Sequence, residues 1–108
     1  MSEFIYLYRN GERLSAEVMQ QQMHKWNDWM KALGAGGHLK DAGHPLERSG
    51  KIVNAKNVFD GPFAEAKDVI GGFSIIEAKD IDHAVELSRG CPIFNVGGAV
   101  EVRPVMKM

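Results

Sequence analysis

The chain begins with residues 4–8, a short aromatic and branched run that predicts a strand and is followed by the turn signal Asn10-Gly11. Successive side chains of a strand point to opposite faces. Both faces of this strand are apolar, with Phe4, Tyr6 and Tyr8 on one side and Ile5 and Leu7 on the other. We therefore expect the strand to be covered on both faces.

A helix is predicted from residue 15 to about residue 33. Ser15 can cap its N-terminus, and the glycines at positions 34, 36 and 37 end it. Apolar residues recur every three or four positions, the spacing of one buried helical face: Met19, Met23, Trp26, Met30 and Leu33, with Trp29 at the flank. Because Met fills irregular gaps and Trp buries a large area, this stripe is more simply explained as core than as a ligand or cofactor box.

The middle of the chain predicts strands separated by loops. Residues 38–46 are polar, contain Gly and Pro, and favour a short edge strand. Residues 51–59 favour one strand with a bend near Asn54 or Asn57, and residues 60–63, Asp-Gly-Pro-Phe, form a strong turn signal. Residues 71–78 predict a central strand.

The last third predicts a second helix and a final strand. Asp80 can cap a helix that runs to Arg89 with a narrow stripe of mostly small residues: Ile81, Ala84, Val85 and Ser88. Residues 99–103 alternate strictly, which places Val100 and Val102 on one face of a strand and Glu101 and Arg103 on the other. We interpret Cys91, between these elements, as a small apolar filler.

The order of elements predicts an α+β fold, a ferredoxin-like antiparallel sheet with two helices on one face. No further helix is available to cover the opposite face of the sheet, although the first strand is apolar there. We therefore expect a homodimer in which two chains pack sheet against sheet.

Composition narrows the class of protein without naming a function. The 108 residues are 44% hydrophobic, enough for a single domain over residues 1–108. One cysteine excludes an internal disulfide and fits a reducing compartment, so we expect a cytoplasmic protein. The net charge of −1 argues against a nucleic-acid partner. A membrane partner is not expected either, because no run approaches the ~18 apolar residues of a membrane span.

Three segments carry a resemblance to a known family: residues 60–67, Asp-Gly-Pro-Phe-Ala-Glu-Ala-Lys, then Gly71-Gly72-Phe73, then residues 101–106, Glu-Val-Arg-Pro-Val-Met. Together they resemble the DGPF group of the YCII-related proteins over nearly the whole chain. The resemblance implies a dimeric ferredoxin-like domain, an α/β barrel formed by two chains. It also implies a poorly defined activity and an association with sigma factors.

The resemblance also suggests catalytic candidates, because some relatives have been proposed to use a helix His and a nearby Asp for proton transfer. Alignment on Leu33 and Gly37 places Trp26, and not His24, at the position of that His. Asp41 would then lack its partner unless His38 or His44 replaces it. The simpler interpretation is that these three residues are solvated, and we expect no metal or cofactor, because the spacing fixes no coordination geometry.

Ligand-binding candidates gather around the turn. Asp60, Glu65 and Lys67 surround a rigid turn, where Lys67 could pair with a carboxylate and the free backbone amides could receive an anion. Arg103 beside Glu101 could bind a carboxylate or phosphate. Alternatively, Asp60 caps the turn and the other charges form ordinary ion pairs.

Three functions stay open. The first is a small-molecule binding or regulatory module, the second an acid/base enzyme for a small polar substrate, and the third an interaction domain that serves a sigma factor.

Overall fold

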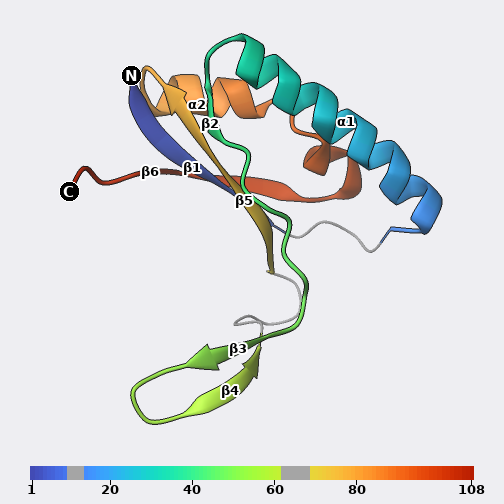
Figure 1. Ribbon diagram of the computed structural model, residues 1–108, viewed down its shortest axis with the longest axis vertical. Helices are drawn as coiled ribbons and strands as arrows, with labels where there is room; N and C mark the ends of the chain where they lie inside the picture. Colours follow the sequence, from blue (N-terminus) through green and yellow to red (C-terminus); the bar gives the residue numbers. More distant parts are fainter. Residues whose placement is uncertain (10–13, 62–68) are drawn as a thin grey trace.

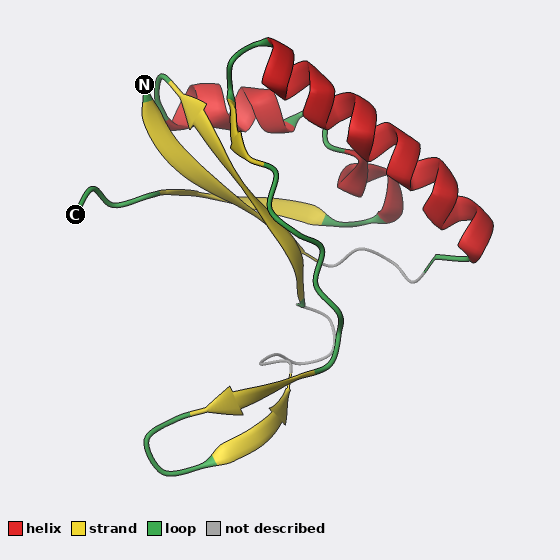
Figure 2. Cartoon of the chain, in the orientation of Figure 1, coloured by secondary structure: helices red, strands yellow, loops and turns green. Residues whose placement is uncertain are grey.

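The computed structural model describes residues 1–9, 14–61 and 69–108. It is a two-layer α+β structure in which both helices lie on one face of a sheet (Figures 1 and 2). The elements in chain order are β1 (Ser2–Arg9), α1 (Ala16–Ala35), β2 (Leu39–Asp41), β3 (Gly50–Val53), β4 (Val58–Gly61), β5 (Ile70–Ala78), α2 (Ile81–Ser88), the 3₁₀ helix η1 (Pro92–Val96) and β6 (Ala99–Pro104).

The main sheet has four strands in the order β2-β5-β1-β6, and every neighbouring pair is antiparallel. This order is that of a ferredoxin-like fold, which confirms the predicted class and the central position of the strand at residues 71–78. Tyr6 lies opposite Ser74 of β5 and Val102 of β6, so their side chains share the face that the helices cover.

The helices begin where the sequence predicts. The Ser15 side chain accepts a hydrogen bond from the amide of Val18, and the Asp80 side chain accepts one from the amide of His83. Both caps satisfy an amide that would otherwise lack a partner in the first turn. No helix of the described chain is long and apolar enough to cross a membrane.

The core lies between the helices and the sheet. Tyr6 and Ile76 are fully buried, and the Tyr6 hydroxyl donates a hydrogen bond to the carbonyl of Ala84 in α2. Trp29, which we expected at the flank of the helix stripe, is buried and stacks against Tyr6 with ring centroids 6.0 Å apart. Cys91 is buried, as expected for a filler.

The predicted stripe of α1 is core only at its C-terminal end. Leu33 is buried, but Met19 and Met23 are 53% and 61% exposed, which corrects the expectation of one buried face. The reason is length: a 20-residue helix is about 30 Å long, and the N-terminal half of α1 projects past the strands (Figure 1).

The single strand predicted over residues 51–59 is instead the hairpin β3–β4, which corrects that assignment. The Asn54 side chain accepts hydrogen bonds from the amides of Lys56 and Asn57, so the expected bend is a full reversal of the chain. Asp60 and Gly61, predicted to open a turn, belong to β4, while residues 62 and 63 lie outside the described part.

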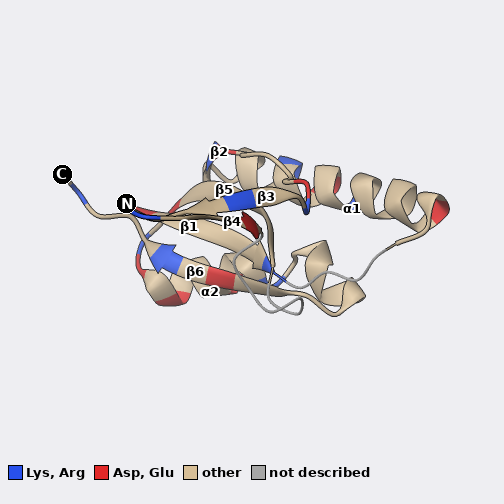
Figure 3. Ribbon diagram, turned by 90° about the horizontal axis from the view of Figure 1, so that it is seen from below, with Lys and Arg blue, Asp and Glu red and all other residues tan. Residues whose placement is uncertain are grey.

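The sheet face opposite the helices carries a row of half-buried apolar side chains: Ile5, Leu7, Phe73 and Ile75. Glu101 and Arg103 lie on this face of β6, as the alternation predicted, because Leu7 pairs with Glu101 and Ile5 with Arg103. We call this surface the open face. In Figure 3, where the ribbon is coloured by charge, β6 carries both a basic and an acidic position.

Candidate functional site

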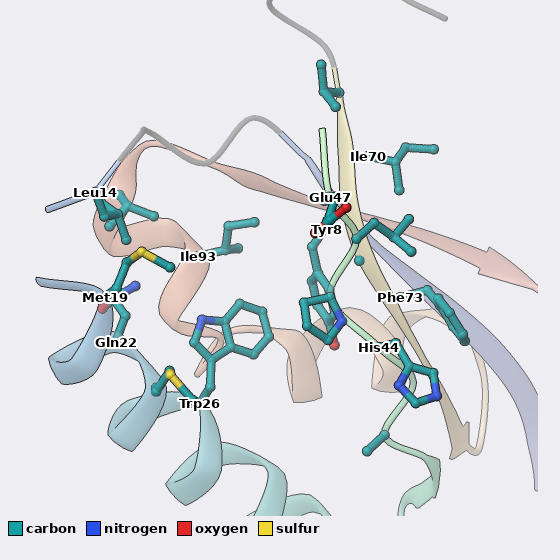
Figure 4. A pocket seen from close by; sticks show the side chains of 18 of the residues that line it. Tyr8, Leu14, Met19, Gln22, Trp26, His44, Glu47, Ile70, Phe73 and Ile93 are labelled. Atoms are coloured by element: carbon teal, nitrogen blue, oxygen red, sulfur yellow. The ribbon is translucent and has the colours of Figure 1, made fainter. Parts of the chain in front are cut away.

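A cleft of about 540 Å³ lies beside the N-terminal half of α1. Its other boundaries are the segment after β2, residues 42–48, and the beginning of β5, residues 69–73 (Figure 4). The volume is within the range of ordinary small-molecule sites, roughly 300–1,000 Å³.

The α1 wall of the cleft is built from the residues of the sequence stripe. Met19, Met23, Trp26 and Met30 all line it. The Trp26 ring meets the Tyr8 ring edge-on, with centroids 4.7 Å apart. The spacing of the stripe favours core over a ligand box, yet its exposed members form the wall of a cleft. Apolar periodicity identifies a face of a helix, and it does not tell what lies against that face.

A short chain of hydrogen bonds that begins at Tyr8 connects β1, β5 and the segment after β2. The Tyr8 hydroxyl donates to Oγ of Ser74 at 2.7 Å, and Ser74 Oγ donates to the carbonyl of Ala42 at 2.7 Å. Burial raises the pKa of the Tyr8 hydroxyl above its usual value, and the bond to Ser74 opposes this only in part. The hydroxyl therefore stays protonated near neutral pH and acts as a structural donor.

The segment opposite α1 is shaped by a bulge after β2. Asp41 Oδ1 accepts a hydrogen bond from the amide of Gly43 at 2.8 Å, and Gly43 has a positive φ of 69°. A Cβ on Gly43 would lie 1.8 Å from the carbonyl oxygen of Phe73, so this close approach requires glycine. The chain then pairs again with β5 through Pro45 and Gly72, which completes the wall.

Few polar side chains line the cleft: Gln22, Asn27, His44, Glu47 and Arg48. Gln22 is 6% exposed, and its Nε2 donates to the carbonyl of Pro92 at 3.0 Å, which attaches α1 to η1. The sequence interpretation missed Gln22. The available signal was its spacing, because Gln22 is three residues from Met19 and four from Trp26.

The three catalytic candidates are not brought together. His44 lines the cleft, but its ring lies against Phe73, with centroids 6.3 Å apart, and points away from Trp26 (Figure 4). Asp41 is exposed and binds the amide of Gly43. His38 is not among the residues that line the cleft; its Nδ1 lies 3.0 Å from the carbonyl oxygen of Glu77.

The ligand-binding candidates are also separate in the described chain. Asp60 pairs with Lys51 on the hairpin. On the open face, Nε of Arg103 lies 4.0 Å from Oε2 of Glu101. Glu65 and Lys67 lie outside the described residues, so their predicted role stays a prediction.

The described residues show neither a cluster of metal ligands nor a reactive thiol. Over residues 1–9, 14–61 and 69–108, no three His, Cys, Asp or Glu side chains are grouped to hold a metal ion. Burial raises the pKa of the Cys91 thiol to about 12, so the thiolate is strongly disfavoured.

Known proteins resemble the chain in sequence and in fold. The uncharacterized protein R00369 of Rhizobium meliloti (strain 1021) is 41% identical over 49 residues, which span 44% of this chain and 40% of that relative. A solved structure similar in fold is 5-chloro-2-hydroxyhydroquinone dehydrochlorinase (TftG) from Burkholderia phenoliruptrix AC1100, in complex with 2,5-dihydroxybenzoquinone. It has a TM-score of 0.52 and 20% identity, and the match covers 98% of this chain and 95% of that chain. The similarity to the TftG structure shows the fold alone. The sequence profile of the YCII-related domain matches residues 1–108, and the chain belongs to this family.

Proposed function

We propose that the protein binds a small, largely apolar, ring-containing molecule in the cleft beside α1. The observation that carries the proposal is the lining of that cleft, which is mostly apolar, includes three methionines and three aromatic side chains, and has few polar groups. Such a composition is typical of small-molecule sites, where apolar walls supply affinity and a few polar groups orient the ligand.

The exposed methionines support this proposal energetically. Met19 and Met23 keep more than half of their surface in water, although they form one wall of a concave site. A bound apolar molecule would remove this surface from water, at roughly 25 cal/mol per Å². Methionine is flexible and polarizable, so the wall can adapt to the outline of a ring.

The aromatic side chains favour a ring over an aliphatic chain. Trp26 and Tyr8 both line the cleft and meet edge-on, and an aromatic ligand can pack against them in offset or edge-to-face geometry. TftG was solved with 2,5-dihydroxybenzoquinone, itself a small ring. For this chain the ring class is proposed from the lining of its own cleft.

The test uses 2-naphthol as the probe and isothermal titration calorimetry as the readout. We expect a saturable binding isotherm for the unmodified protein and at least tenfold weaker binding in Met23→Glu. Gln21→Glu is the matched control, because Gln21 is also an exposed residue of α1 but does not line the cleft. Equal binding by both variants would contradict the proposal.

Binding is favoured over acid/base catalysis by the position of His44. A general base has to reach the proton that it removes. The imidazole of His44 lies against Phe73, and Asp41 is engaged with Gly43. The association with a sigma factor and the placement in the DGPF group stay predictions.

We also propose that the protein works as a homodimer that buries the open face. Ile5 and Leu7 on β1 and Phe73 and Ile75 on β5 form an apolar row on a face that neither helix covers. Apolar rows of this kind mark interaction surfaces. Light scattering at micromolar concentration is expected to give the mass of two chains, and a monomer would contradict this proposal.

A further inference from the structure

The hairpin β3–β4, residues 50–61, lies clear of the four-stranded sheet (Figure 1). We call it the arm. Three cross-strand pairs define its faces: Lys51 with Asp60, Ile52 with Phe59, and Val53 with Val58. Because side chains alternate along each strand, the arm has apolar side chains on both faces.

Three of these four apolar side chains are exposed, and Ile52 is half-buried. Val53 is 70% exposed, Val58 64% and Phe59 51%. A two-stranded hairpin is marginally stable in water unless a hydrophobic face packs against another layer. The arm is therefore expected to gain stability from a covering surface that the described part of its own chain does not provide.

The dimensions of the chain agree with a missing partner. The radius of gyration is 15.0 Å, against about 13 Å for a compact chain of this length. The extents are 43 × 42 × 18 Å, so the chain is broad and thin. An extended arm beside an uncovered sheet gives this shape.

We propose that the arm of one copy packs on the open face of a second copy of this chain. This inference rests on the proposed homodimer and adds the element that holds it. A two-fold axis would give each copy one arm on its partner and one partner arm on its own open face. The apolar side chains of both surfaces would then be covered at once.

Charge complementarity favours a second copy over an unrelated protein. The arm carries Lys51, Lys56 and Asp60, two cations and one anion. At the border of the open face next to β2, Glu3 lies opposite Glu77 on the neighbouring strand, and Glu3 also forms an ion pair with Lys40. This border therefore carries two anions and one cation. The positive arm therefore complements the border next to β2, and not the border along β6, where Arg9 and Arg103 outnumber Glu101.

The lengths are also compatible. Each strand of the arm has four residues, about 13 Å at the usual rise of a β-strand, and β1 has eight, about 26 Å. One arm can cover about half the length of β1, which leaves room for direct contact between the two sheets.

The first test replaces the apolar pair at the tip of the arm. The double variant Val53→Lys with Val58→Glu keeps a favourable opposite-charge pair across the hairpin while removing its apolar surface. We expect its dimer dissociation constant, measured by sedimentation equilibrium, to rise at least tenfold. The control is Ile81→Glu with Val85→Lys, two exposed apolar residues of α2, and it should leave the constant unchanged.

The second test locates the arm directly. In a Cys91→Ala background, one chain carries Val58→Cys and another carries Ile5→Cys, Leu7→Cys or Ile75→Cys, and a short bis-maleimide is added after the two are refolded together. We expect cross-links between the differently substituted chains. Cross-links of Val58→Cys with itself would place arm against arm and overturn the inference.

The outcomes separate the two proposals. A dimer that neither cross-links through Val58→Cys nor weakens in Val53→Lys with Val58→Glu overturns the arm and leaves the dimer standing. A wild-type chain that is monomeric at micromolar concentration overturns both. Ligand binding in the cleft is measured independently and depends on neither result.

Discussion

The hydrogen-bond chain from Tyr8 through Ser74 to Ala42 holds the wall of the cleft against the sheet, and a double-mutant cycle can measure it. The single variants are Tyr8→Phe and Ser74→Ala, and the third variant combines them. Ser74 is fully buried and Tyr8 nearly so, which means that water cannot replace a lost partner without opening the structure.

The expected magnitudes follow from what each change leaves unpaired. Tyr8→Phe removes one neutral hydrogen bond but leaves Ser74 bonded to Ala42, so it should cost about 1 kcal/mol of unfolding free energy. Ser74→Ala leaves both the Tyr8 hydroxyl and the Ala42 carbonyl without this partner, and should cost ~2–4 kcal/mol. In the Ser74→Ala background the buried hydroxyl is already unsatisfied, so its removal should cost nothing or stabilise. The coupling energy should therefore be about 1 kcal/mol or more.

The assay is urea unfolding at one fixed protein concentration, followed by circular dichroism. Circular dichroism is preferred because Trp26 and Trp29 contact Tyr8, and their emission would change with the substitution itself. If Tyr8→Phe costs the same in both backgrounds, the hydroxyl chain does not exist as described and the wall of the cleft is held by other contacts.

Three further predictions concern backbone strain, alkaline pH and the thiol. Gly43→Ala should lower the unfolding free energy by more than ~3 kcal/mol, because a Cβ at this position would lie 1.8 Å from the carbonyl oxygen of Phe73. Gly37→Ala should lower it by only about 1 kcal/mol, because Gly37 has a similar positive φ but no atom within 4 Å of the added Cβ. Thermal denaturation measures both changes. Burial raises the pKa of the Tyr6 hydroxyl, so the folded state holds this proton more tightly. The stability that this raised pKa contributes is complete below pH ~10, and it is lost as the pH rises further, by up to ~1.4 kcal/mol per pH unit. Between pH ~9 and ~11.5 the melting temperature should therefore fall less steeply in Tyr6→Phe than in the unmodified protein. Cys91, with its pKa raised to about 12, should not react with a thiol reagent at pH 8 until urea unfolds the chain, and rapid labelling of the folded protein would contradict its burial.

Local signals predicted the helices and the sheet well because they act within a few residues. Ser15 and Asp80 each cap a helix, and both act on amides three residues away. The alternation in β6 correctly placed Val102 and Arg103 on opposite faces, since a strand has only two faces, and the structure turns Val102 towards the core.

Features that depend on distant partners were not predicted. The β-branched residues on either side of Asn54 and Asn57 fit one bent strand as well as two paired strands, and only the pairing decides. The cleft is a similar case. Met19 and Met23 have the spacing of a core face, but the sheet ends before it reaches them, and no local signal records that.

The candidate charges illustrate the same limit. Lys51 is the partner of Asp60, although the sequence directed attention to charges that follow Asp60 in the chain. Side chains nine positions apart become neighbours only because the hairpin folds back on itself. Ion pairs that depend on strand register require the register to be known first.

The central claim is that the cleft beside α1 binds a ring-containing molecule, and the indole N–H signals of the two tryptophans test it most directly. Trp26 lines the cleft, whereas Trp29 is buried behind it and its Nε1 donates to the carbonyl of Leu87 at 3.3 Å. In a ¹⁵N correlation spectrum, assigned with Trp26→Phe and Trp29→Phe, titration with 2-naphthol should shift the Trp26 signal along a saturable curve and leave the Trp29 signal nearly unmoved. An unmoved Trp26 signal at saturating probe, with shifts confined to β1 and β5 on the open face, would contradict the account.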